Sequence, residues 1–141
     1  MTPAAADTAS LVQPLVRSAV PTFIVPDVAA AARWYVEHLG FQIAGTVPEA
    51  EPWGFASISL GSAELMLIRL DGYQRPLSTA ERPEWMWDAY IRMDGVRAYC
   101  ERLRNAPFVI APLRKQRHGD WEFDVRDPNG YVLVFGGDAH H

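Results

Sequence analysis

The chain has 141 residues, 49% of them apolar, which is enough for one domain with a hydrophobic core. Its net charge of −4 and its scattered basic residues argue against a nucleic-acid or membrane partner. The short basic cluster within residues 102–117 is interpreted as a solvated face and a loop.

The single cysteine, Cys100, excludes an intrachain disulfide and fits a reducing, cytoplasmic location. Residues 1–18 lack the basic start and continuous apolar run of a signal peptide, so we expect a flexible N-terminal tail. No stretch is long enough for a membrane-spanning helix. Residues 137–141 are expected to form a C-terminal tail, in which His140 and His141 are assigned no function.

The first predicted elements are a strand over residues 20–25 and a helix whose first N–H groups Asp27 can cap. Gly40 is placed to end this helix in the left-handed conformation, with Phe41 folding back onto it. Three strands are expected next, over residues 41–46, 55–60 and 64–70. The apolar stripe of the helix consists of Val28, Ala32, Tyr35, Val36 and Leu39.

The second half repeats this order after a linking loop over residues 71–86. A strand over residues 89–93 leads to Asp94, the expected cap of a second helix. The apolar stripe of that helix contains Cys100, which is therefore interpreted as a core residue and not as a nucleophile. The last strands are expected over residues 108–111, 121–126 and 131–135, with a tight turn at 127–130.

The two halves also match in sequence. At an offset of 67 residues, six identities fall within one short window. The order β-α-β-β-β therefore occurs twice, which indicates a duplicated domain. We expect one domain over residues 19–136, made of an N-terminal module (19–70) and a C-terminal module (87–136). The identical pairs are Ile24 and Ile91, Asp27 and Asp94, Ala31 and Ala98, Phe41 and Phe108, Ile43 and Ile110, and Ala44 and Ala111.

Two segments, "VPDVAAAARWYVEHLGF" from residue 25 and "FDVRDPNGYVLVF" from residue 123, resemble the vicinal-oxygen-chelate superfamily. This superfamily includes glyoxalase I, bleomycin-resistance proteins and extradiol dioxygenases. The resemblance implies an α+β fold in which two βαβββ modules form an open, eight-stranded, barrel-like cleft. It also implies a homodimer with ligand pockets at or near the subunit contact.

Enzymes of that superfamily hold a divalent metal with His and Glu side chains from cleft-facing strands. The resemblance carries the ligand positions to Val20, Leu67, Asp88 and Val134. Three of these four are aliphatic and cannot bind a metal, so we expect neither a metal nor another cofactor. Neighbouring positions, which a one-residue slip would bring into the cleft, are no better: Pro21, Leu133 and Phe135.

The final hairpin supplies the candidate polar groups. Its alternation puts Phe123, Val125, Leu133 and Phe135 on the core face, so Glu122 and Asp124 should face the cleft, near Asp88. Three interpretations stay open for these carboxylates: ion pairs with Arg92 and Arg126, recognition of a ligand, or metal chelation together with His118. A close carboxylate pair can also act as a general base.

Aromatic residues in or beside loops offer flat surfaces for a planar or cationic ligand, although a dimer contact can also bury them. We therefore predict a small-molecule-binding protein of the bleomycin-resistance type, which sequesters an aromatic or cationic antibiotic or metabolite without catalytic residues. The alternatives are a metal-dependent lyase, isomerase or dioxygenase with unusual ligands, and a binding fold used only in regulation or assembly. The predicted ligand-binding residues are Trp53, Tyr73, Trp85, Trp87, Asp88, Tyr90, Arg92, Glu122 and Asp124.

Overall fold

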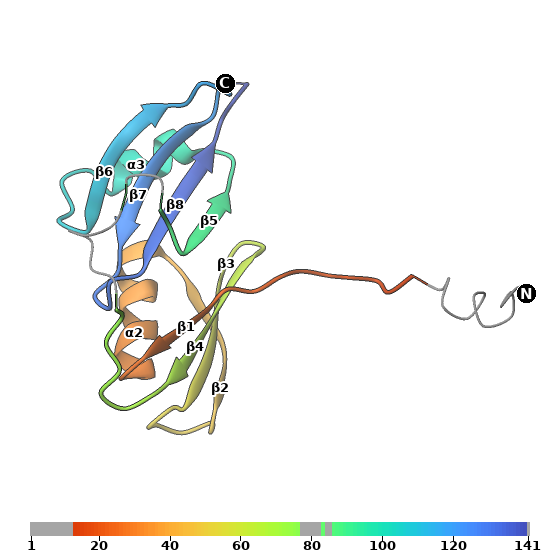
Figure 1. Ribbon diagram of the computed structural model, residues 1–141, viewed down its shortest axis with the longest axis vertical. Coiled ribbons are helices and arrows are strands. Elements are labelled where there is room, and N and C mark those ends of the chain that lie inside the picture. The colour runs from red at the N-terminus through yellow and green to blue at the C-terminus, as the bar shows by residue number, and fades with distance from the viewer. Residues whose placement is uncertain (1–12, 77–82, 84–85, 141) are drawn as a thin grey trace, which may run out of the picture.

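Each half of the chain forms a β-α-β-β-β unit in the computed structural model, which describes residues 13–76, 83 and 86–140 (Figure 1). The expected element order is therefore confirmed. The N-terminal module consists of β1 (Thr22–Val25), α2 (Val28–Trp34), the π-helical turn η1 (Tyr35–Leu39), β2 (Gln42–Val47), β3 (Phe55–Leu60) and β4 (Ala63–Arg69). The C-terminal module consists of β5 (Ala89–Arg92), α3 (Val96–Arg102), β6 (Val109–Lys115), β7 (Trp121–Arg126) and β8 (Val132–Gly137).

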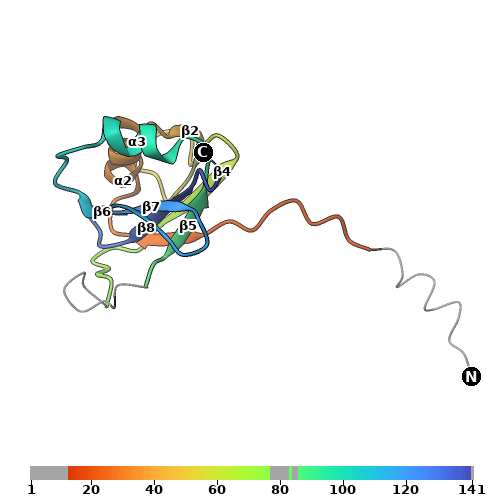
Figure 2. The same ribbon diagram turned by 90° about the horizontal axis from the view of Figure 1, so that it is seen from above.

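The strands form two four-stranded mixed sheets, ordered β1-β4-β3-β2 and β5-β8-β7-β6. In each sheet the first strand of the module pairs in parallel with the last, and the other pairs are antiparallel. The sheets do not close into a barrel, and each is covered by helix on one face: α2 packs on β3 and β4, and α3 on β7 and β8. Residues 13–17, before β1, extend away from both modules (Figures 1 and 2).

The helix-covered faces meet in one hydrophobic core that includes residues of both modules. The alternation predicted for the last hairpin is confirmed, because its four core-face residues are all fully buried. Leu67, expected to face the cleft, is also fully buried on the helix-covered face, so that expectation is wrong. Its neighbours Met66 and Ile68 lie on the open face instead.

The turn between β7 and β8 joins the two modules. Tyr131 stacks on Phe23 with ring centroids 4.2 Å apart, and its hydroxyl donates a 2.7 Å hydrogen bond to the carbonyl of Ile24. Tyr35 donates to the carboxylate of Asp127 at 2.6 Å. These contacts fix the turn of the C-terminal module against β1 and η1 of the N-terminal module.

Local sequence signals decide the ends of the first helix but not the start of the second. Asp27 accepts a hydrogen bond from the N–H of Ala30 at 3.0 Å, and Gly40 has the expected positive φ of 80°. Asp94 does not cap α3, which overturns that prediction. The carboxylate of Asp138 accepts hydrogen bonds there instead, from the N–H groups of Gly95 at 2.6 Å and Arg97 at 3.1 Å.

Strand β6 extends four residues beyond its predicted end at Ala111, and Pro112 lies inside it. The pairing register of β6 with β7 shifts between Ala111 and Arg114, and Pro112 lies within that irregular stretch. An edge strand tolerates a proline at such a point, since no ladder hydrogen bond is required there. Among the described residues, no helix is long and apolar enough to cross a bilayer.

Candidate ligand-binding site

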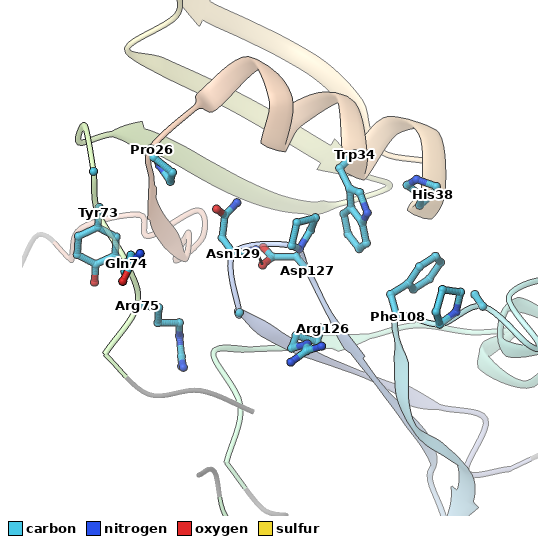
Figure 3. A pocket seen from close by; sticks show the side chains of 15 residues that line it. Pro26, Trp34, His38, Tyr73, Gln74, Arg75, Phe108, Arg126, Asp127 and Asn129 are labelled. Atoms are coloured by element: carbon cyan, nitrogen blue, oxygen red, sulfur yellow. Dashed lines mark hydrogen bonds between the residues drawn. The ribbon is translucent and has the colours of Figure 1, made fainter. Parts of the chain in front are cut away.

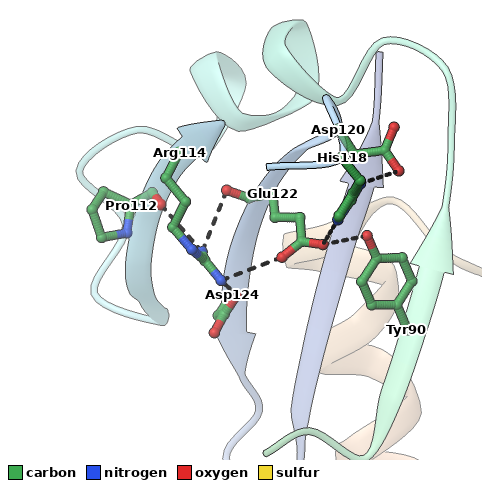
Figure 4. A network of polar contacts seen from close by, with 7 residues as sticks. All are labelled: Tyr90, Pro112, Arg114, His118, Asp120, Glu122 and Asp124. Atoms are coloured by element: carbon green, nitrogen blue, oxygen red, sulfur yellow. Dashed lines mark hydrogen bonds and ion pairs between the residues drawn. The ribbon is translucent and has the colours of Figure 1, made fainter. Parts of the chain in front are cut away.

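The open face of the C-terminal sheet carries a connected group of polar side chains (Figure 4). They come from β5, β6, β7 and the loop before β7. Glu122 lies at the centre, because its side chain contacts those of Tyr90, Arg114 and His118.

The carboxylates of this group are almost inaccessible to solvent. Glu122 is 8% exposed and Asp124 is 1% exposed. The guanidinium of Arg114 lies 3.0 Å from Asp124 and 3.6 Å from Glu122, and it also donates to the carbonyls of Pro112 and Glu122. Buried charges require such compensation, so Arg114 is what allows two carboxylates to lie side by side here.

Tyr90 donates a hydrogen bond of 2.5 Å to Glu122. Burial raises the pKa of the Tyr90 hydroxyl, and the hydrogen bond and negative charge of Glu122 raise it further. The hydroxyl therefore stays protonated and acts as a fixed donor, and not as a base.

His118 links the loop before β7 to this group. Its Nδ1 lies 3.6 Å from Asp120, and its Nε2 lies 3.8 Å from Glu122. Because the two carboxylates contact opposite ring nitrogens, the three groups do not converge on a common point. Across the described residues, no group of three His, Cys, Asp or Glu side chains has the arrangement of a metal site.

Trp87 gives the group an aromatic wall. Its side chain is 46% exposed, and its ring centroid lies 5.6 Å from that of Tyr90, with the ring planes tilted by 59°. Arg92 lies over the ring of Tyr90 at 5.4 Å. A cavity of about 470 Å³ is formed by Trp87, Tyr90, Arg92, His118 and Glu122. This volume is within the range of small-molecule sites.

The sequence profile of the Glyoxalase/Bleomycin resistance protein/Dioxygenase superfamily matches residues 17–135. The chain belongs to this superfamily. No curated protein matches the sequence significantly.

Several solved structures share the fold of this chain. TioX from Micromonospora sp. ML1 is 21% identical with a TM-score of 0.66, and the match covers 84% of this chain and 95% of TioX. The bleomycin-binding protein of Streptomyces verticillus, solved with copper(II)-bleomycin, is 24% identical with a TM-score of 0.65, covering 87% and 97%. TnmS3, an antibiotic-binding protein from Streptomyces sp. CB03234, is 23% identical with a TM-score of 0.55, covering 88% and 98%.

The residues at the four positions to which the resemblance carries the metal ligands do not fit a divalent cation. Leu67 and Val134 are buried aliphatic side chains, and Val20 precedes β1. Asp88 has the right chemistry, but one of its oxygens pairs with Arg75 and the other accepts from the N–H of Val132 at 2.8 Å. These four positions therefore do not supply the ligand set through which metal-dependent members of the superfamily act.

The structure brings together four of the residues predicted from sequence: Trp87, Tyr90, Arg92 and Glu122. Asp124 lies beside them but is buried under Arg114. Sequence reasoning expected Asp88 near Glu122, and this is wrong. Asp88 contacts Val132 at the start of β8, whereas Glu122 pairs with Gly136 near the end of that strand.

The other predicted aromatic residues lie elsewhere. Trp53 packs under Arg33, whose guanidinium lies 5.5 Å from the ring, in the N-terminal module. Tyr73 lies in the linking loop beside a different cavity. Trp85 lies outside the described residues.

Two members of the site were missed or misassigned from sequence. Arg114 was placed in a solvated basic cluster, although its guanidinium pairs with both buried carboxylates. His118 was considered only as a metal ligand. No local signal identifies Arg114, since its side chain reaches the site through the irregular pairing of β6.

Proposed function

We propose that the protein binds and sequesters a small planar ligand, aromatic or cationic, on the open face of the C-terminal sheet beside Trp87. The ligand class is an antibiotic or a metabolite. The observation that carries the proposal is the half-exposed Trp87 ring, placed against Tyr90 and above a carboxylate whose position is fixed by its neighbours.

Contact with a ligand in the cavity would remove the exposed aromatic ring of Trp87 from water, which is favourable. Stacking on Trp87 would bury apolar area at little entropic cost, and a cationic ring would gain attraction from the indole face. The nearby carboxylate of Glu122 adds a negative charge that is held in place by Tyr90 and Arg114. Electrostatic complementarity therefore favours a positive group at the end of the ligand that approaches Glu122.

Similar structures support this ligand class. One was solved with copper(II)-bleomycin, and another is described as an antibiotic-binding protein. Both share the fold with this chain, so a cleft on the same scaffold is a reasonable place for the same kind of ligand.

We also propose that a second copy of the chain completes the site as a homodimer. The site is open, and the N-terminal sheet has its own open face, on which Ile68 is 42% exposed. The segment before β1 is exposed as well, with Leu15 at 82% and Val16 at 78%. Apolar side chains exposed in this way suit contact with another subunit. The single cysteine supports a cytoplasmic location.

An enzyme has less support. Cys100 is partly buried, and burial raises the pKa of its thiol, which disfavours a nucleophilic thiolate. The elemental metal content of purified protein, grown with Zn, Ni, Mn and Fe and compared with a chelator-treated sample, tests the metal-dependent alternative directly. A full equivalent of one metal per chain would overturn the metal-free form of the proposal.

Isothermal titration with copper(II)-bleomycin and with planar cations such as ethidium and proflavine tests binding itself. We expect saturable binding, weakened about tenfold or more by Trp87→Leu, as for an aromatic residue at the centre of a contact. Trp53→Leu is the matched control, because Trp53 lies in the other module under Arg33. Absence of saturable binding across this panel, or equal effects of the two substitutions, contradicts the proposal.

A further inference from the structure

A second cavity, of about 1020 Å³, is lined by residues of both modules and of the linking loop (Figure 3). Trp34 of α2 and His38 of η1 contribute from the N-terminal module, and Phe108, just before β6, contributes from the C-terminal module. The linking loop adds Tyr73 and Arg75. None of these five residues lines the cavity beside Trp87.

One end of this cavity is aromatic. Trp34 meets Phe108 edge to face, with ring centroids 5.2 Å apart and planes at 77°. His38 lies 5.4 Å from Trp34 and 5.5 Å from Phe108. In Figure 3 the Trp34 side chain extends from α2 towards the turn and towards Phe108. These rings are fixed by one another, so they offer a preformed apolar surface to a flat ligand.

Guanidinium groups line the other part of the cavity. Arg126, at the end of β7, and Arg75, in the linking loop, both line it. Arg75 is held in place by its ion pair with Asp88 and by the ring of Tyr131, 5.3 Å from its guanidinium. A guanidinium presents a planar fork of N–H donors, which matches a carboxylate better than a point charge does.

One carboxylate, that of Asp127, also belongs to the residues that line the cavity. Asp127 is 2% exposed. Its Oδ2 accepts from the hydroxyl of Tyr35, and its Oδ1 accepts from the N–H groups of Asn129 and Tyr131. Both oxygens are therefore engaged with the protein, and the side chain is not available to attract a cationic ligand.

From this arrangement we propose that the cavity is a second binding site, for a planar aromatic carboxylate. The ring of the ligand contacts Trp34 and Phe108, and its carboxylate faces Arg126 and Arg75. Because the walls come from both modules, a bound ligand connects them and stabilises the folded chain by linkage. This site is independent of the proposed function: it involves another tryptophan and the opposite ligand charge.

Titration of the 15N-labelled full chain with 2-naphthoate, followed by NMR, tests this proposal. The indole N–H signals of Trp34 and Trp87 are assigned from the variants Trp34→Phe and Trp87→Phe. We expect 2-naphthoate to shift the Trp34 signal saturably and to leave the Trp87 signal in place. The ligands 2-naphthamide and 2-naphthylmethylammonium keep the ring and change the charge, and both should bind more weakly than 2-naphthoate.

Arg126→Gln is the decisive variant, and it should weaken 2-naphthoate binding by about tenfold or more, as expected for loss of a charge-assisted hydrogen bond. Arg117→Gln removes the same charge from an exposed loop position outside the cavity and should leave the affinity unchanged. Because both arginines are exposed, both variants should fold, which their amide spectra check.

Three results would overturn the site: an unshifted Trp34 signal at saturating 2-naphthoate, equal affinity for the three naphthalene ligands, or equal effects of the two arginine variants. A shift confined to the Trp87 signal would place the ligand in the other cavity. If no ligand binds in the cavity beside Trp87 while 2-naphthoate still binds beside Trp34, the result contradicts the proposed function alone.

Discussion

The hydroxyl of Tyr35 donates a 2.6 Å hydrogen bond to Oδ2 of Asp127, a residue 92 positions later in the chain. Tyr35 is 0% exposed and Asp127 is 2% exposed. Burial raises the pKa of Asp127, and the hydrogen bonds from Tyr35, Tyr131 and Asn129 offset part of that rise. Since the two residues belong to different modules, this bond holds the turn between β7 and β8 against η1.

Tyr35→Phe should therefore destabilise the whole domain. The substitution keeps the ring in the core but removes a donor from a buried carboxyl, and a hydrogen bond to a charged group contributes about 1.5–3 kcal/mol. Urea unfolding followed by circular dichroism measures the loss. Tyr99→Phe is the control, because its hydroxyl donates at 2.7 Å to the neutral carbonyl of Leu39, and such a bond contributes about 1 kcal/mol. A loss for Tyr35→Phe no larger than that for Tyr99→Phe contradicts the argument.

The raised pKa of Asp127 also predicts a pH dependence. A carboxyl whose pKa is higher in the folded than in the unfolded state binds a proton more tightly when folded. The contribution of Asp127 to the free energy of unfolding is therefore most favourable below its ordinary pKa of 3.8. It declines as the pH rises through the raised pKa of the folded state. The stability of the native protein minus that of Asp127→Asn should therefore fall as the pH rises from below 3.8 through the raised folded-state pKa of Asp127. A difference that rises over this range would show that the pKa is lowered.

The cap of α3 offers a prediction about two aspartates. Asp138→Ala removes the acceptor for the N–H groups of Gly95 and Arg97, and losing a helix cap destabilises by about 0.5–2 kcal/mol. Asp94→Ala should change stability little, because Asp94 is exposed and does not cap the helix. Thermal unfolding of both variants measures the comparison. The reverse order would restore the assignment made from the local sequence.

The ends of the two helices show where sequence reasoning succeeds and where it stops. Asp27 and Gly40 act on their own helix within a few residues, so local rules found them. Asp138 binds the N-cap residue of its helix, Gly95, which lies 43 residues before it in the chain, and no local pattern encodes that contact. The core face of the last hairpin was predictable because alternation depends only on the pleat.

The candidate site was predictable in part for the same reason. Alternation placed Glu122 on the open face. Tyr90 was predicted only as an aromatic ligand contact, and the parallel pairing of β5 with β8 in the structure brings it beside Glu122. The partner cation was not predictable, because the register of β6 changes between Ala111 and Arg114 and moves the arginine opposite Glu122. The cluster of Trp34, His38 and Phe108 was also hidden, since it forms only when the two modules pack together.

Arg114→Gln should destabilise the protein, because it leaves Asp124 and Glu122 buried without their shared cation. Breaking a fully buried pair costs about 3–5 kcal/mol, and since the Arg114 side chain is 35% exposed we expect about 2 kcal/mol. Combining Arg114→Gln with Asp124→Asn should recover part of this loss, which a double-mutant cycle in urea measures. Additive losses would show that the pair does not interact. Arg117→Gln, on the exposed loop, is the control with the same change of charge.

Gly136→Ala should displace the Tyr90 ring and so disturb its hydrogen bond to Glu122. A methyl group at position 136 would lie 2.1 Å from the Tyr90 hydroxyl oxygen and 2.7 Å from its Cζ, so the ring must turn away from Glu122. We expect a loss of about 1–3 kcal/mol in stability and weaker ligand binding beside Trp87. Gly45→Ala is the control, because a methyl group there has no atom within 4 Å.

The background variant Tyr90→Ala identifies the cause. Once the Tyr90 ring is removed, Gly136→Ala should have little further effect, so the two substitutions should be strongly non-additive in urea unfolding. If Gly136→Ala destabilises the protein equally with and without the Tyr90 ring, the cause of the loss is not a clash with Tyr90. Non-additivity would instead explain why a glycine lies beneath Tyr90: it leaves room for the hydroxyl that orients Glu122.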